Sequence, residues 1–221
     1  MGMITIHVGL AKTGSTALQN YLANAPRETE QHLVYLGKGK NGGSFRFPTD
    51  VKHWRSQVLK ILATKRDVIL SEEQYLGTAW TMYDNARHYA VAMRDYFADH
   101  TEFQVVIYLR PQHQYFPSLY NEGTKKGRLR GLRPDEFMKP LLESKYARYQ
   151  RLINDLLDVF GPERLAIRAH QPGMDVVADF LNLIHLQPWS SLEDLTPANV
   201  SLSPAQLELL RRSHAADPDA Q

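Results

Sequence analysis

Short apolar runs alternate with longer amphipathic segments along most of this chain. Apolar runs of this length, several rich in β-branched residues, predict buried strands. They span residues 3–8, 33–36, 67–70, 103–109 and 165–168. Apolar residues at helical spacing predict helices in between. We expect these helices over 15–23, 51–63, 81–98, 112–126, 134–142, 145–160, 176–184 and 203–212.

Strands and helices that alternate in this way predict βαβ units. The expected fold is therefore α/β, a mainly parallel sheet flanked by helices in a P-loop NTPase-like three-layer sandwich. We expect one domain over residues 1–221, with the residues after about 213 frayed. Ligands bind such sheets at the carboxyl ends of the strands. Three expected strands end in polar residues there, at the Lys12 turn, at 71–73 and at Arg110.

The composition narrows the class of function. A formal net charge of only +2 argues against a dedicated nucleic-acid binder, so we expect no nucleic-acid partner. The absence of cysteine excludes disulfides, thiolate metal sites and cysteine nucleophiles. Nine histidines are scattered without ligand spacing, so we expect no metal. We find neither a signal-peptide pattern over residues 1–8 nor an apolar run that could span a membrane, and expect a cytoplasmic protein without stable membrane insertion.

The turn over residues 9–16, with the sequence GLAKTGST, lies between an expected strand and an expected helix. A turn in this place directs backbone N–H groups and a helix N-terminus at one point, which suits a phosphate. Lys12 adds a positive charge. Hydroxyl donors come from Thr13, Ser15 and Thr16. In the ATP-binding Walker pattern the lysine follows the second glycine, but here Lys12 precedes Gly14 and Ser15 stands in the lysine position.

Residues 6–19, IHVGLAKTGSTALQ, resemble the phosphosulfate-binding loop of sulfotransferases that use 3′-phosphoadenosine 5′-phosphosulfate (PAPS). Bacterial and glycan-type members commonly carry Lys-Thr-Gly-Thr-Thr there, and Ser15 replaces one threonine. The resemblance implies that Lys12 contacts the bridging oxygen of the leaving group. It also implies a loop that holds the 5′-phosphosulfate, made of Ala11, Lys12, Thr13, Gly14, Ser15 and Thr16.

A second resemblance to this family lies at the end of the strand expected over 103–109. In the family, an arginine there and a serine eight residues later bind the 3′-phosphate of the donor. Arg110 and Ser118 have this spacing, and a guanidinium can bind a phosphate through two hydrogen bonds. This chain differs from the family pattern in two ways. The family often has Arg-Asp-Pro where this chain has Arg-Pro-Gln. Pro117 also predicts that the helix after the strand is kinked or starts late.

The catalytic base of these enzymes is a histidine in one branch and a glutamate after a Ser-Ser pair in the other. The segment 69–73, ILSEE, is similar to the second signature and places Glu73 at the catalytic position, with Glu72 in place of the second serine. Glu72 and a histidine remain alternatives. A buried core residue is the simpler interpretation of His7, and His113 lies near Arg110 in the sequence.

The sequence therefore predicts a PAPS-dependent sulfotransferase that needs no metal, forms 3′,5′-ADP and acts on a hydroxyl of a small molecule or glycan. The alternatives are a P-loop nucleotide kinase or NTPase, and a non-catalytic nucleotide- or RNA-binding module. The basic stretch 125–133 is either a solvated loop or a lip that contacts the 3′-phosphate or an anionic acceptor. The loop 37–48 is a candidate gate for the acceptor. Neither the acceptor nor the oligomeric state has a sequence signal.

Overall fold

The computed structural model describes residues 2–37, 58–98, 102–190 and 202–216. Five strands form one sheet in the order β2-β3-β1-β4-β5, and every neighbouring pair is parallel. The strands are β1 (Ile4–His7), β2 (Leu33–Gly37), β3 (Asp67–Ser71), β4 (Phe103–Leu109) and β5 (Leu165–Ala169). The predicted α/β fold with a parallel sheet is confirmed.

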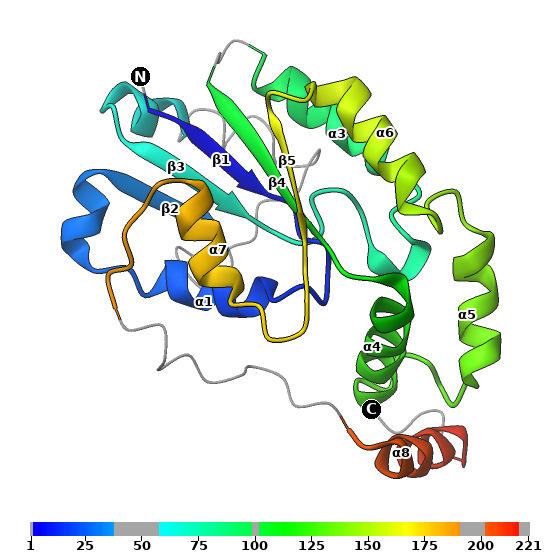
Figure 1. Cartoon of the computed structure of the whole chain (residues 1–221). Coiled ribbons are helices and arrows are strands. Elements are labelled where there is room, and N and C mark those ends of the chain that lie inside the picture. The colour runs from blue at the N-terminus through cyan, green and yellow to red at the C-terminus, as the bar shows by residue number, and fades with distance from the viewer. Residues whose placement is uncertain (1, 38–57, 99–101, 191–201, 217–221) are drawn as a thin grey trace.

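Helices cover both faces of this sheet (Figure 1). One face carries α1 (Ser15–Ala23) and α7 (Val176–Leu183), and the other carries α3 (Ala86–Tyr96) and α6 (Tyr149–Phe160). Three further helices lie together beyond the end of the sheet. They are α4 (Gln112–Lys125), α5 (Pro134–Glu143) and α8 (Pro204–Ala216). Short 3₁₀ turns form η1 (Arg27–Gln31) and η2 (Ala79–Thr81), and residues 58–63 are also helical.

Alternate residues of the central strands build two separate cores, because successive side chains of a strand point to opposite faces. Ile4 and Ile6 pack into the core beneath α3 and α6. Val106 and Tyr108 pack into the core beneath α1 and α7. Both faces of the sheet are therefore apolar, and this is why the strands read as almost continuous hydrophobic runs in the sequence.

Two helices begin later than the sequence pattern predicts. The helix expected over 81–98 starts at Ala86, because Met82 and Tyr83 adopt left-handed backbone angles (φ 47° and 59°) that no α-helix contains. The helix expected over 145–160 starts at Tyr149. Before it, Lys145 turns back to form an ion pair with Asp155.

The helix expected after β4 is neither delayed nor interrupted, although it contains Pro117. α4 begins at Gln112 and continues past Ser118. Pro117 lies in the second turn, where its missing N–H removes one hydrogen bond near the helix start. The last helix extends to Ala216, beyond the expected end at 212. The loop expected over 37–48 falls, after Gly37, outside the described residues, as does the 51–57 part of the helix expected over 51–63.

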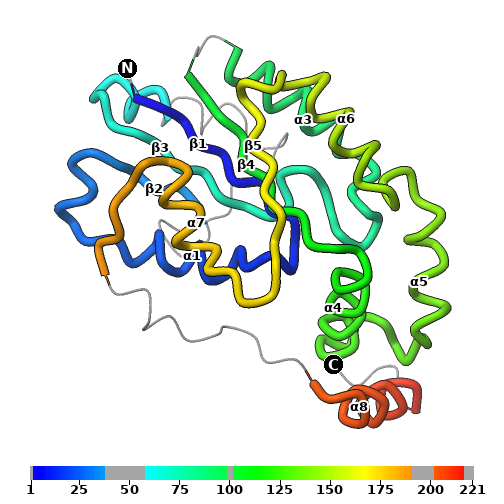
Figure 2. The backbone as a smooth tube through the Cα atoms, viewed as in Figure 1, coloured from blue at the N-terminus to red at the C-terminus, as the bar shows by residue number. Residues whose placement is uncertain are grey.

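The strand order places a ligand crevice at the end of β1. The chain leaves β1 towards β2 on one side of the sheet, and it later crosses from β3 over β1 to β4 on the other side. Ligands of parallel sheets bind at such a reversal of strand order, outside the carboxyl ends of the strands. The segments that follow β1, β3 and β4 emerge side by side at this edge (Figure 2).

Replacement of Phe180 by alanine tests the core beneath α1 and α7. The Phe180 ring is fully buried and lies edge-on to the His7 ring at 5.9 Å. Phe180→Ala should lower the free energy of unfolding by about 3–5 kcal/mol, because it leaves a cavity in a packed core. Urea denaturation measures this change. Leu209→Ala, on the exposed side of α8, is the control and should cost little; equal losses in both variants would contradict the packing described here.

Candidate functional site

The segment after β1 first continues the sheet and then turns sharply into α1. Val8 N–H donates to Val106 O and Leu10 N–H donates to Tyr108 O, each at 3.0 Å. The turn needs left-handed backbone angles at Lys12 and at Gly14 (φ 66° and 84°). Gly14 also meets the start of α7 closely, since an added Cβ would lie 2.9 Å from Val176 Cγ2. Glycine is thus required there both for its conformation and for its size.

The first backbone N–H groups of α1 donate no hydrogen bond to a capping side chain. Gly14 is the N-cap residue of α1, and no side chain caps this helix. The first backbone N–H groups of a helix lack intrahelical partners, and they attract anions together with the helix dipole. Thr16 lies in this first turn and lines a cleft.

The hydroxyls of Thr13 and Ser15 serve the loop itself, which differs from the expectation that they face a phosphate. Thr13 Oγ1 donates to Leu10 O at 2.6 Å, and Ser15 Oγ donates to the same carbonyl oxygen at 3.2 Å. Both side chains are buried. The two hydroxyls therefore hold the shape of the turn. Ser15 still lines the cleft beside Gly14 and Thr16, whereas Thr13 does not.

Tyr83 braces the same loop from the segment after β3. The N–H of Ala11 donates to the Tyr83 hydroxyl at 2.9 Å. Burial raises the pKa of Tyr83 to about 12, so the hydroxyl stays protonated at neutral pH. Tyr83 was not a predicted site residue. It falls in a stretch that the hydrophobic pattern assigned to a helix, and no local signal marks it.

Lys12 is paired with a carboxylate on α4. Its Nζ lies 2.6 Å from Glu122 Oε2, and Glu122 also pairs with Lys126. Burial alone would raise the pKa of Glu122, but hydrogen bonds from Lys12 and Lys126 lower it to about 2. The carboxylate is therefore ionised at neutral pH. Glu122 was missed from the sequence, although it lies one helical turn after Ser118 and so on the same face of α4.

Arg110 and Ser118, predicted as a pair, lie together in the structure. Arg110 Nη1 donates to Ser118 Oγ at 3.3 Å and to Lys12 O at 3.3 Å. The guanidinium thus joins the loop after β1 to α4. Its Nε is buried and has no hydrogen-bond partner among the described residues. An unpaired buried N–H of this kind is costly, and it suits a site that an anion completes.

The two adjacent carboxylates after β3 separate. Glu72 is buried, its N–H donates to His7 O at 3.1 Å, and its Oε1 accepts from Gln74 N–H at 3.3 Å. Burial, and then the charge of Glu72, raise the pKa of Tyr75, so the Glu72 carboxylate lies among buried tyrosines. Glu73 instead lines the cleft that Lys12 also lines. The structure thus places Glu73 at the candidate site and turns Glu72 away from it.

Lys12, Glu73, Arg110, Ser118 and Glu122 meet in a cleft of about 630 Å³ at the carboxyl edge of the sheet. Its walls are the loop after β1, the segment 73–83, α4 with the turn after it, and His170 at the end of β5. A cleft of this volume suits a nucleotide-sized ligand. Cations outnumber carboxylates among its charged lining residues, which are Lys12, Arg110, Lys125, Lys126 and Arg128 against Glu73 and Glu122.

Three histidines near the site differ in their burial and in whether they line the cleft. His7 is fully buried outside the cleft, with Nδ1 2.8 Å from Ser71 Oγ, and burial lowers its pKa to about 3. His113 is exposed and does not line the cleft. His170, which the sequence did not single out, lines the cleft, and burial followed by the charge of Arg110 lowers its pKa. Its position directly after a strand was the available signal.

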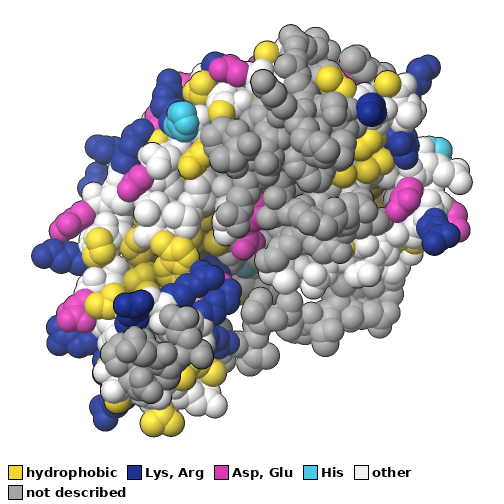
Figure 3. Space-filling view, turned by 180° about the vertical axis from the view of Figure 1, so that it is seen from behind, with side chains coloured by type: hydrophobic (Ala, Val, Ile, Leu, Met, Phe, Trp, Pro, Cys, Tyr) yellow, Lys and Arg dark blue, Asp and Glu magenta, His cyan; other side chains and the backbone are white. Residues whose placement is uncertain are grey.

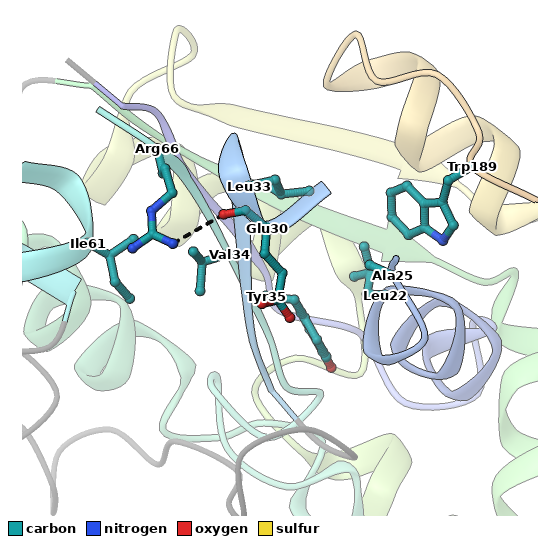
Figure 4. Close-up of a pocket in the computed structure, with 9 residues that line it drawn as sticks. All are labelled: Leu22, Ala25, Glu30, Leu33, Val34, Tyr35, Ile61, Arg66 and Trp189. Carbon is teal, nitrogen blue, oxygen red and sulfur yellow. Dashed lines mark hydrogen bonds between the residues drawn. The ribbon is translucent and has the colours of Figure 1, made fainter. Parts of the chain in front are cut away.

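A second, smaller cavity of about 170 Å³ lies beside the edge strand β2 (Figure 4). Arg66 crosses it and donates to the backbone oxygen of Glu30 at 3.1 Å. Leu22 and Trp189 line it, and Trp189 stacks on Tyr21 at 4.4 Å. None of the predicted site residues lines this cavity.

Within residues 2–37, 58–98, 102–190 and 202–216, no group of three or more His, Asp or Glu side chains is placed to hold a metal ion. In those same ranges no helix is both long enough and apolar enough to cross a membrane.

Comparison with known proteins finds likeness in structure and none in sequence. No family model matches the chain, and no curated protein matches its sequence. The chain is similar to the crystal structure of a sulfotransferase from Alicyclobacillus acidocaldarius, at 14% sequence identity and a TM-score of 0.49. The match covers 97% of this chain and 94% of that chain.

The buried His7 should make stability depend on pH. In the unfolded chain its pKa is near 6.5, and in the folded protein it is about 3. Below pH 6.5 the unfolded state therefore binds a proton that the folded state does not, and stability falls as the pH decreases towards 3.

Unfolding free energies of the wild type and His7→Asn, measured by urea denaturation between about pH 8 and pH 4, test this. The wild type should lose roughly 1.4 kcal/mol more per pH unit than the variant below pH 6.5. Parallel curves for the two proteins would show that His7 is not held neutral by the fold.

Proposed function

We propose that this chain is a sulfotransferase that moves the sulfuryl group of PAPS to an acceptor hydroxyl and releases 3′,5′-ADP. The observation that carries the proposal is the presence of two linked anion positions in one cleft. The first is the uncapped start of α1 with Lys12, and the second is Arg110 with Ser118. Arg110 Nη1 joins the two through its hydrogen bond to Lys12 O.

Two anion positions favour PAPS because its ribose carries a 3′-phosphate in addition to the 5′-phosphosulfate. The resemblance of residues 6–19 to the phosphosulfate loop assigns the 5′ end to the start of α1. Arg110 is then the group for the 3′-phosphate, which ATP lacks. The unpaired Nε of Arg110 and the excess of cations in the cleft fit a ligand with several negative charges.

The transfer uses the donor's activated sulfuryl group, whose leaving group is 3′,5′-ADP. A bond forms between the acceptor oxygen and sulfur while the bond between sulfur and the bridging phosphate oxygen breaks. Glu73 takes the proton of the acceptor hydroxyl as general base. Negative charge that develops on the bridging oxygen meets the ammonium group of Lys12 and the N–H groups at the start of α1.

Lys12 must leave Glu122 to act in this way, since the two groups form an ion pair in the structure. Lys126 remains beside Glu122 after such an exchange and keeps its carboxylate paired. The cost of releasing Lys12 is therefore smaller than the cost of leaving a half-buried carboxylate without any counter-charge.

Binding of 3′,5′-ADP tests the donor site. We expect 3′,5′-ADP to raise the melting temperature more than ATP with Mg²⁺ or a short single-stranded RNA does, because a ligand stabilises the state that binds it. Lys12→Ala and Arg110→Ala should each weaken 3′,5′-ADP binding roughly tenfold or more, since each removes a hydrogen bond to a charged group. Isothermal titration calorimetry gives the dissociation constants.

Lys139→Ala on α5 is the matched control, because Lys139 is exposed and does not line the cleft. It should bind 3′,5′-ADP as the wild type does. A melting shift with ATP and none with 3′,5′-ADP would instead favour a nucleotide kinase or NTPase. A shift with RNA alone would favour a binding module.

Glu73→Gln tests the base. Transfer of radiolabelled sulfate from PAPS to a panel of phenols and sugars should fall by about 10²–10⁴, the usual contribution of a general base. Binding of 3′,5′-ADP should stay as in the wild type. Glu72→Gln is the matched control and should keep its turnover, because Glu72 does not line the cleft. If Glu72→Gln is inactive and Glu73→Gln is active, the assignment is reversed.

A further inference from the structure

The basic stretch 125–133 divides into two halves with different surroundings. Lys125, Lys126 and Arg128 line the cleft, and Arg130 and Arg133 do not. Seen from behind, Lys and Arg side chains gather around the lower left of the molecule, the part that α4 and α8 occupy (Figure 3). The sequence left open whether this stretch is a solvated loop or a lip of the site, and in the structure its two halves differ.

The first half is anchored to α4. Gly127 N–H donates to Thr124 O at 3.1 Å, and Arg128 N–H donates to Gly123 O at 2.9 Å. The side chain of Leu129 is buried against Gly123. These contacts fix the backbone of the turn, so the cations on it keep their place at the wall of the cleft.

Gly123 allows a close approach that also places Arg128. A Cβ at position 123 would lie 2.8 Å from Leu129 Cγ and 3.0 Å from Trp80 Cη2, so only glycine lets both side chains pack here. The Arg128 guanidinium carbon lies 5.5 Å from the centre of the Trp80 ring, within cation–π distance. Trp80 lines the cleft in the same wall segment as Glu73.

The second half of the stretch has a structural role. The Arg133 side chain pairs with Asp135 and Glu136 at the start of α5. Gly131 packs under Ala215 of α8, and its carbonyl accepts a hydrogen bond from Arg211 Nη1 at 2.9 Å. These residues tie α5 and α8 to the loop and contribute nothing to the lining of the cleft.

The positive charge of the cleft is not fully matched by the proposed donor and by the ion pairs within the cleft. Lys12 and Arg110 serve the donor under the proposed function, and Lys126 pairs with Glu122. Arg128 pairs with no carboxylate in the part of the chain that the structure describes. Positive charge therefore remains on the wall that Trp80 and Glu73 also form.

We infer that this wall is the acceptor subsite and that the acceptor is itself anionic. It carries a carboxylate, sulfate or phosphate group near the hydroxyl that it offers, and this group binds Arg128. This inference rests on the proposed function, because it takes Glu73 as the base and the α1–Arg110 part of the cleft as the donor site. A guanidinium already oriented on an indole ring binds such an oxyanion with little loss of side-chain entropy.

The test uses the full chain saturated with 3′,5′-ADP, so that added polyanions cannot occupy the donor positions. Carboxymethyl-dextran oligosaccharides and neutral dextran oligosaccharides of the same length are titrated by calorimetry. We expect binding of the carboxylated sugar only. Arg128→Gln should weaken it about tenfold, the effect of one lost charge-assisted hydrogen bond.

Arg130→Gln is the matched control, since it removes the same charge from the same exposed stretch but does not line the cleft. It should bind the carboxylated sugar nearly as the wild type does. Equal binding of the neutral sugar would overturn the inference, and so would equal losses in the two variants. Binding of a short RNA in place of the sugar would also overturn it.

The dissociation constant of 3′,5′-ADP, measured in the same variants, separates the two proposals. Arg128→Gln should leave it unchanged. A comparable loss of 3′,5′-ADP binding in Arg128→Gln would assign the turn to the donor and overturn the acceptor subsite alone. Failure of the wild type to bind 3′,5′-ADP would count against the proposed function itself.

Discussion

The site depends on one constraint: α1 starts without a side-chain cap at the point where the strand order of the sheet reverses. The sheet delivers β1 to this point between β3 and β4, and Gly14 lets the chain turn there against α7. The hydroxyls of Thr13, Ser15 and Tyr83 then form hydrogen bonds that fix the backbone of the loop. The start of α1 is thereby held in one conformation, so the binding of an anion there costs little conformational entropy.

α4 and the turn after it place polar and charged side chains around the start of α1. One face of α4 carries Ser118 and Glu122, and the turn after it carries Arg128. Ser118 meets Arg110, and Glu122 meets Lys12. A single helix therefore spans the cleft from the proposed 3′-phosphate position to the proposed acceptor wall. Because α4 packs against α5 and α8, these distant helices also position the groups in the cleft.

Much of the fold could be predicted from the sequence, because each strand is a distinct apolar run and each helix has its own apolar spacing. Two helices begin later than predicted because a tertiary contact overrides the local pattern. One case is Tyr83, whose left-handed backbone has no signal in the sequence. In the site, Lys12 was singled out by its place in the turn after a strand, and Arg110 and Ser118 by the resemblance to a family signature. The three residues lie together. Glu122 and His170 were missed because their role arises only when separate elements meet.

The pairing of Lys12 with Glu122 has a consequence for selectivity. The carboxylate is tethered to the same molecule, so it competes for Lys12 at a high effective concentration that does not change with the solution. A small free anion such as chloride or inorganic sulfate would have to displace it with a single contact. A ligand that also reaches Arg110 can offset the exchange with its second anionic group. The ion pair between Lys12 and Glu122 thus disfavours common inorganic anions relative to a ligand with two anionic groups.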